Sequence, residues 1–304
     1  MNNSWAPLLA VFFWSGNFII TKLAASSIEP GAIGFYRSCV AVLVMTPFLL
    51  PAVVQKRTQV VKYLPKLAIL GLFGTAMYQG LSYAAAKTTT AINMGIIASS
   101  IPLFTIMLSR FYLNEKVRIE VAIGCVISLV GLFILITQGN WEVISLMELN
   151  YGDALILIAS VFYALYCVLL QRWIFPLSIW ESLYIQSLWA TIQLLPVYYF
   201  TPSSQMTNQN IGIILYAGIL ASVIAPLFWM RGISSLGPNR ASVFMNLFPL
   251  ITAAIAIAVL NETAQLYHLA GGILTLTGVA LAQTNFISSI VYGRILNKEN
   301  LCRS

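Results

Sequence analysis

Long apolar runs separated by short polar turns follow one another along the whole chain. About twenty apolar residues in an α-helix are enough to cross the roughly 30 Å hydrocarbon core of a bilayer. The pattern therefore predicts an all-α membrane protein with ten transmembrane helices. In the first half they lie near 5–24, 32–50, 64–86, 91–112 and 118–137, and in the second half near 152–171, 179–200, 211–231, 239–260 and 265–286.

The second half of the chain repeats the first. An offset of 147 residues brings prolines, glycines and an Asn-Glu pair into register, and upstream the offset becomes 149. Five is an odd number, so the second repeat must begin on the opposite side of the membrane, which predicts two inverted five-helix repeats. We divide the chain into a first repeat over 5–137, an outer linker over 138–151, a second repeat over 152–286 and a cytoplasmic tail over 287–304. Coinciding landmarks are Pro102 with Pro249, Gly124 with Gly271, Gly131 with Gly278, and Asn114-Glu115 with Asn261-Glu262.

Composition and charge agree with a membrane protein. Hydrophobic residues make up 59% of the chain and charged residues 8%, against about 25% charged in soluble domains. With a cytoplasmic N-terminus, the outer loops keep only Lys22 and Lys87, so both termini are expected in the cytoplasm. The net charge of +7 is spread over short loops, which indicates contact with the lipid bilayer and no nucleic-acid partner.

Proline marks two of the predicted helices at matching mid-span positions. Pro102 and Pro249 cannot donate to the carbonyl groups of Ala98 and Met245, which predicts two helix kinks. Ser99 and Asn246 follow those carbonyls. Either these polar groups line a central cavity, or the kinks serve packing and serine satisfies the backbone internally.

Aromatic and polar side chains suggest where a solute would bind. Trp14 and Asn17 share one face of the first helix, and Tyr163 and Tyr166 occupy the equivalent positions of the sixth. Rings with polar edges at mid-membrane depth can hold an organic solute, although each ring alone is also compatible with packing. Further polar candidates for this cavity are Tyr78, Gln79 and Asn93.

Arg37 is the one charge predicted well inside the membrane, and Lys22 lies near the outer end of the first helix. Together they would attract a carboxylate or phosphate; alternatively, Arg37 snorkels outward or pairs with Glu29. Gln186 takes the place of Arg37 in the second repeat, so the cavity is expected to be electrostatically asymmetric. No acidic residue is predicted near mid-span, and Asp153 is expected at the outer edge, so the coupling ion stays open.

An enzyme is not expected from this sequence. His268 is the only histidine and is predicted at the membrane interface, so a two-histidine metal site is excluded. The chain has no glycine-rich phosphate loop with lysine. We therefore expect no metal, no cofactor and no ATP.

Small residues at helical spacing predict close helix packing or the contact of a homodimer. Glu115 and Glu262 lie at turns and are expected to cap helices and not to bind substrate. The small-residue faces are Gly124, Ser128 and Gly131 in the first repeat and Gly271, Thr275 and Gly278 in the second.

Several short motifs, in order and in duplicate, resemble those of EamA domains in the drug/metabolite transporter superfamily. The resemblance covers both repeats and implies two inverted five-helix repeats with a central cavity from spans 1, 3, 4, 6, 8 and 9. It also implies alternating access, a bacterial-type plasma (inner) membrane, and export or uptake of small metabolites. The motifs are Trp14-Ser15-Gly16-Asn17-Phe18, residues 89–95 with Pro102 and Asn114-Glu115, and residues 237–241 with Pro249 and Asn261-Glu262.

These features favour a secondary transporter for a small amphipathic metabolite, with an amino acid or other carboxylate as the leading class. A multidrug or cationic-metabolite exporter using the same aromatic cavity is one alternative. A membrane scaffold held by the small-residue faces is the other.

Overall fold

The computed structural model describes residues 5–112, 119–137, 139–140, 150–202, 205–236, 241 and 243–281. Most of these residues are helical, and none forms a strand, so the all-α class is confirmed for the described part of the chain. Most of the predicted linker over 138–151, the tail over 287–304, the Asn114-Glu115 pair and residues 237–240 lie outside the described residues.

Each of the ten predicted ranges overlaps at least one helix. The first half contains α1 (Trp5–Ala24), α2 (Pro30–Gln55), α3 (Arg57–Gly71), the π-helix η1 (Leu72–Met77), α4 (Tyr78–Ala85), α5 (Ala91–Ala98), α6 (Ile101–Tyr112) and α7 (Ile119–Ile136). The second half contains α9 (Tyr151–Arg172), α10 (Ile179–Phe200), α11 (Ile211–Leu215), the π-helix η2 (Tyr216–Ile224), α12 (Ala225–Leu236), the 3-10 helix η3 (Val243–Leu247), α14 (Phe248–Leu260) and a helix over Leu266–Leu281, called the 266–281 helix below.

Length and composition make six helical segments of the described chain able to cross a membrane. Three shorter apolar helices cover Val126–Leu135, Phe244–Leu260 and Leu266–Leu281. α10 belongs to neither group and contains Glu181, Gln186 and Gln193. The six are Trp5–Ala24, Pro30–Gln55, Arg57–Ala85, Ala91–Tyr112, Tyr151–Arg172 and Ile211–Leu236.

Hydrogen-bonding side chains fix where several helices begin. Ser178 and Glu181 form a capping box at the start of α10, and Asn150 accepts from the backbone N–H of Gly152 at the start of α9. At the start of α5, Thr90 accepts from the N–H of Asn93. These caps satisfy backbone donors that a helix start otherwise leaves free.

The spans that contain Pro102 and Pro249, in which the sequence predicts kinks, are interrupted more strongly than by a kink. α5 ends at Ala98, a turn covers Ser99 and Ser100, and α6 starts again at Ile101 with Pro102 as its second residue. In the second half, η3 precedes α14, whose second residue is Pro249. Proline is well tolerated in the first turn of a helix, because the N–H it lacks would have no helical partner there.

Two π-helical segments occupy equivalent places in the two halves. η1 joins α3 to α4, and η2 joins α11 to α12. At the offset of 147, Leu72–Met77 falls on the last six residues of Tyr216–Ile224. A π segment widens the helix and shifts its hydrogen-bond register, and such segments often occur at functional sites.

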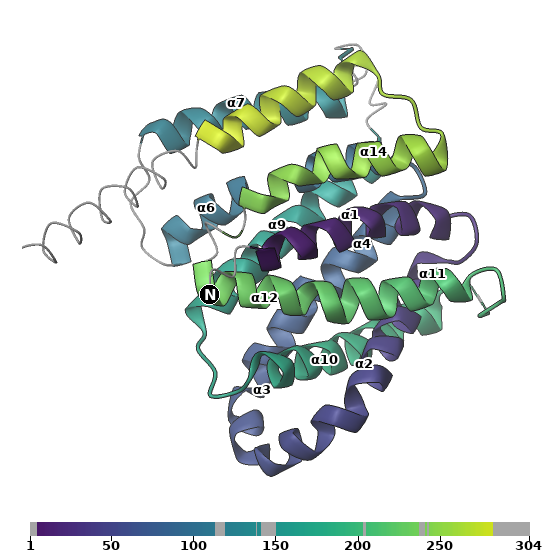
Figure 1. Ribbon diagram of the computed structural model, residues 1–304, viewed down its shortest axis with the longest axis vertical. Helices are drawn as coiled ribbons and strands as arrows, with labels where there is room; N and C mark the ends of the chain where they lie inside the picture. The colour runs from purple at the N-terminus through teal and green to yellow at the C-terminus, as the bar shows by residue number, and fades with distance from the viewer. Residues whose placement is uncertain are drawn as a thin grey trace, which may run out of the picture.

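The two halves of the chain are interleaved. α1 packs on α12 and α9 on α4, so the first helix of each half lies against the third segment of the other. α2 packs on its equivalent α10, and α5 packs on α14, which is the equivalent of α6. Figure 1 shows the result, with α7 at the top of the view and α2 and α3 at the bottom. The largest core cluster lies among α1, α4, α5, α9, α12 and α14.

The small-residue faces of α7 and the 266–281 helix pack on each other. A Cβ on Gly131 would lie 2.5 Å from the backbone N of Thr275, and one on Gly278 would lie 2.3 Å from the backbone N of Ser128. Figure 1 shows these two helices side by side. Both small-residue faces therefore pack against each other inside one chain.

Candidate functional site

A central cavity of about 40 Å³ is lined by residues from both π segments and from helices of both halves. On this scale it has room for a few water molecules. Residues from both halves of the chain form the wall of this cavity. The lining residues are Trp14, Arg37, Gly74, Thr75, Tyr78, Gln79, Ile101, Tyr163, Tyr166, Leu183, Gln186, Ala221, Ser222, Pro226, Met245 and Phe248.

Most of the lining residues form pairs related by the internal repeat. The offset of 147 accounts for four of the pairs and the offset of 149 for two. Each half therefore contributes the same positions to the wall, but with different side chains. The pairs are Gly74 with Ala221, Thr75 with Ser222, Gln79 with Pro226, Ile101 with Phe248, Trp14 with Tyr163, and Arg37 with Gln186.

Arg37 is the charged group of this wall and is 1% exposed. Its Nε and Nη2 donate to Ser222 Oγ at 2.9 and 2.7 Å, and its Nη1 donates to Gln79 Oε1 at 2.7 Å and to Tyr83 Oη at 2.9 Å. All three partners are neutral. Among the residues that the structure describes, no carboxylate lies within ion-pair distance of this guanidinium.

The π segments give Arg37 a hydrogen-bond partner and give the ring of Tyr166 room to pack. Ser222 in η2 donates its hydroxyl proton to the carbonyl of Ala217 at 2.8 Å, which leaves its oxygen lone pairs for Arg37. The indole N–H of Trp14 donates to the carbonyl of Ala221 at 3.0 Å. In η1, a Cβ on Gly74 would lie 2.6 Å from the ring of Tyr166. Glycine at this position lets the tyrosine ring pack directly on the helix backbone.

Aromatic rings form a continuous part of the wall. Trp14 meets Tyr163 edge to face, with ring centroids 5.9 Å apart. Tyr163 in turn lies 4.8 Å from Tyr78 and 5.3 Å from Tyr166, centroid to centroid. Such tilted and edge-to-face pairs are favourable arrangements for aromatic rings and present polar edges to a neighbouring solute.

The structure brings together seven of the twelve residues that the sequence suggested for the cavity. Five others lie elsewhere. Asn17 donates to Thr21 Oγ1 at 3.4 Å, and Ser99 donates to the carbonyl of Ile96 at 2.6 Å. Lys22, Asn93 and Asn246 are also absent from the described wall. The seven are Trp14, Arg37, Tyr78, Gln79, Tyr163, Tyr166 and Gln186.

Lys22 and Arg37 do not form a common site. The ammonium group of Lys22 donates to the carbonyls of Ala86 and Thr89 at 2.9 and 2.6 Å. Arg37 does not snorkel outward, because its side chain is buried. It does not pair with Glu29 either, which forms an ion pair with Lys87 at 2.6 Å.

Asp153 and His268 each lie in the first turn of a helix, and both side chains are buried. Asp153 is 0% exposed and accepts hydrogen bonds from Thr89 Oγ1 and Asn93 Nδ2. His268 is 6% exposed. Its Nε2 lies 2.9 Å from Asn93 Oδ1, and its Nδ1 accepts from the N–H of Gln265. Both side chains are buried because polar partners from another helix or turn surround them.

Glu262 caps a helix, but in the other half of the chain. Its carboxylate accepts from the backbone N–H groups of Ala91 and Ile92 at 2.9 and 3.1 Å, at the start of α5. A carboxylate there also interacts favourably with the helix dipole.

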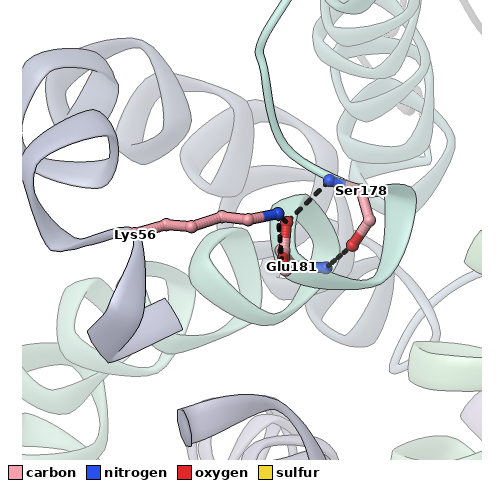
Figure 2. Close-up of polar contacts among 3 residues, drawn as sticks. All are labelled: Lys56, Ser178 and Glu181. Atoms are coloured by element: carbon pink, nitrogen blue, oxygen red, sulfur yellow. Dashed lines mark hydrogen bonds and ion pairs between the residues drawn. The ribbon is translucent and has the colours of Figure 1, made fainter. Parts of the chain in front are cut away.

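An ion pair links the two halves at the end of the molecule that holds the start of α10 (Figure 2). Lys56, between α2 and α3, reaches Glu181 Oε1 at 2.8 Å, and the same carboxylate accepts from the N–H of Ser178. Lys66 lies over Trp173 and Arg172 over Tyr112, so both basic residues lie near the C-terminal end of α9. No group of three histidine, cysteine or acidic side chains in the described chain is close enough to hold a metal ion.

Comparison with known proteins identifies relatives over nearly the whole chain. The EamA-like transporter family matches residues 3–137 and 150–284, two stretches that begin 147 residues apart. The uncharacterized transporter YyaM of Bacillus subtilis is 28% identical over 288 residues, covering 92% of this chain and 93% of that protein. An uncharacterized transporter of Archaeoglobus fulgidus is 29% identical over 294 residues, covering 92% and 98%. A solved structure described only as the crystal structure of a protein is similar in fold, with a TM-score of 0.67, 16% identity, and coverage of 93% and 97%.

Proposed function

Because the chain belongs to the EamA-like transporter family and is a multi-pass membrane protein, we propose that it is a secondary transporter for a small amphipathic carboxylate such as an amino acid. The substrate binds in the central cavity and crosses the plasma membrane by alternating access. The observation on which the substrate class rests is Arg37, a buried cation at the cavity wall with only neutral partners.

The proposed topology has ten helices in two inverted repeats, with both termini in the cytoplasm. Helices that overlap all ten predicted ranges and two family matches at the offset of 147 support it. The reciprocal packing of α1 on α12 and α9 on α4 is what a pseudo-twofold axis in the membrane plane would generate. Lys56, Lys66 and Arg172 gather at the end assigned to the cytoplasm, and Lys22 and Lys87 belong to the other end.

Arg37 has chemistry suited to a carboxylate. A guanidinium has five N–H groups, and four hydrogen bonds to neutral oxygens account for four of them. The remaining N–H and the uncompensated charge are available to an anion in the cavity. Hydrogen bonds between charged groups are roughly twice as strong as neutral ones, and they strengthen further where water is excluded.

The small volume of the cavity supports a transport cycle in which the surrounding helices move. Its volume of about 40 Å³ is far below the roughly 300–1,000 Å³ typical of small-molecule sites. A metabolite therefore enters only when the helices separate on one side, as alternating access requires. The same guanidinium disfavours lipophilic cations as substrates, because two positive charges in one desolvated space repel each other.

The test compares ligand binding by wild type, Arg37→Gln and Lys22→Gln, measured as thermal shifts of detergent-purified protein. The probes are glutamate, aspartate, leucine, glucose and tetraphenylphosphonium. We expect an acidic or neutral amino acid to raise the melting temperature of wild type, because a ligand that binds only the folded state stabilises it. Arg37→Gln should weaken that binding about 10- to 100-fold, the equivalent of losing about 1.5–3 kcal/mol of charged hydrogen bonding.

Lys22→Gln is the matched control, since it removes a positive charge from outside the cavity wall. Its affinity should equal that of wild type. Unchanged affinity of a folded, monodisperse Arg37→Gln protein for every anion would contradict the carboxylate proposal. A shift by tetraphenylphosphonium alone would favour a cation exporter instead.

A further inference from the structure

A second buried polar cluster lies outside the central cavity, around the first turn of α9. Asp153 is the third residue of α9 and is fully buried. Its carboxylate accepts from the hydroxyl of Thr89, and both of its oxygens accept from Asn93 Nδ2 at 3.2 Å. Thr89 and Asn93 belong to the first half of the chain and Asp153 to the second, so this contact joins the halves.

The cluster continues from Asn93 to the 266–281 helix. His268 Nδ1 accepts from the N–H of Gln265 at 2.9 Å, so the ring is neutral and its proton lies on Nε2. That Nε2–H group donates to Asn93 Oδ1 at 2.9 Å. Asn93 therefore connects the carboxylate and the imidazole, with its amide NH2 directed to one and its carbonyl to the other.

Asp153 has no counter-ion within ion-pair distance among the described residues. Lys22 from α1 binds backbone carbonyls, and Lys87 pairs with Glu29. Tyr267 interacts electrostatically with both Asp153 and Glu262, and Glu262 caps α5. The basic groups on other elements packed against α9, Lys66 and Arg110, belong to its opposite end, about 28 Å from Asp153 along the helix.

We propose that Asp153 is a proton-binding site that couples proton uptake to the contact between α5 and the 266–281 helix. An ionised carboxylate buried without a counter-ion carries a large desolvation cost, and acidic groups in such places within membrane proteins often bind transported protons. This inference rests on the proposed transport function: in a secondary transporter, the proton bound by Asp153 would be the coupling ion.

The hydrogen-bond inventory gives the consequence of protonation. One proton is added to a carboxylate oxygen and none is released. Oδ1 of Asp153 already accepts from Thr89, which places the new proton on Oδ2, whose printed neighbour is the donor Asn93 Nδ2 at 3.2 Å. The new O–H group needs an acceptor, and the Asn93 amide supplies one by rotating its Oδ1, which now accepts from His268 Nε2, toward Asp153. The protonated Asp153 therefore competes with His268 for one carbonyl oxygen. The contact between α5 and the 266–281 helix loosens at the end of the molecule assigned to the outer side.

The single histidine makes this directly measurable. Full-length protein carrying 15N-labelled histidine, purified without a histidine tag, gives one imidazole spin system. At neutral pH, NMR should show the neutral Nε2–H tautomer. On acidification, the Nε2 signal should shift in a step as Asp153 takes up its proton, while the Nδ1 signal keeps its unprotonated value, which separates this step from protonation of the imidazole itself. Asp153→Asn, whose side chain is always neutral, should lack this step and should resemble acidified wild type at all pH values.

Glu262→Gln is the matched control, because it neutralises the other carboxylate near Tyr267. It should keep the step. Thr89→Val removes a donor to the ionised carboxylate and should move the step to higher pH, which provides a second route if Asp153→Asn does not fold. The proposal is overturned if the step persists in Asp153→Asn, or disappears in Glu262→Gln alone. No substrate is needed, so this outcome is independent of the ligand-binding test.

Discussion

Arg37 and Gln186 occupy equivalent positions in the two halves, and both line the central cavity. Their surroundings differ as much as their charges. Arg37 makes four hydrogen bonds to Ser222, Gln79 and Tyr83, whereas Gln186 Nε2 donates to Ser182 on its own helix at 2.9 Å. The repeat has preserved which positions face the cavity, while the chemistry at those positions has diverged. Substrate selectivity is therefore expected to arise where the two halves differ.

The largest effect is expected for Gln186→Arg, which removes the difference in charge by giving both halves a guanidinium at this position. The second charge would be buried beside Arg37 and would have only Ser182 from the present partners of Gln186. An uncompensated buried charge costs about 3–5 kcal/mol. Thermal unfolding should show a correspondingly large loss of stability, with Gln186→Met losing much less. Equal losses in the two variants would mean that charge is not the reason.

A smaller effect is expected when the partner of each side chain is removed. Ser222→Ala deletes the acceptor of two guanidinium N–H groups and should cost about 1.5–3 kcal/mol. Ser182→Ala deletes the acceptor of a neutral amide and should cost about 0.5–1.5 kcal/mol. Chemical denaturation of both variants measures the difference. A greater loss for Ser182→Ala would contradict the asymmetry.

The smallest effect is expected from a change in side-chain volume next to the cavity. Gly74 corresponds to Ala221 in the second half, so Gly74→Ala makes the two π segments alike at this position. The added Cβ would lie 2.6 Å from the ring of Tyr166, and displacing that ring should cost about 1–2 kcal/mol. Gly80→Ala is the control, because no heavy atom lies within 4 Å of its Cβ position. That variant should be neutral or slightly more stable when melting temperatures are compared.

The positions of the helices were largely predictable from the sequence, because an apolar run of sufficient length is a strong signal. The local geometry of those helices was not. Pro102 indicates a disturbance but does not say whether the helix bends or stops, since proline removes a hydrogen bond inside a helix and is equally suited to the first turn of a new one. The π segments Leu72–Met77 and Tyr216–Ile224 leave no mark in apolarity, because a wider turn of apolar residues is equally apolar.

The cavity was predictable only in part. Arg37 was found because a charge inside the membrane is costly and rare. Ser222 was missed because a single serine in an apolar helix gives no signal of its direction. Lys22 was grouped with Arg37 because both are basic and near the outer side, but distance along a helix does not define which neighbour a side chain reaches. The repeat offset would have identified Ser222 and Ala221 once Thr75 and Gly74 were known to face the cavity.

The matching π segments also bear on the history of the protein. A π-helical turn holds one residue more than the α-helical turn it replaces, so its simplest origin is the insertion of a single residue into a helix. Both halves contain the segment at the same register, with Leu72–Met77 equivalent to residues 219–224. One insertion before gene duplication accounts for both segments, whereas a later origin requires two independent insertions at one position. The ancestor of each half therefore already had this irregular third helix, and descendants of both halves inherited it.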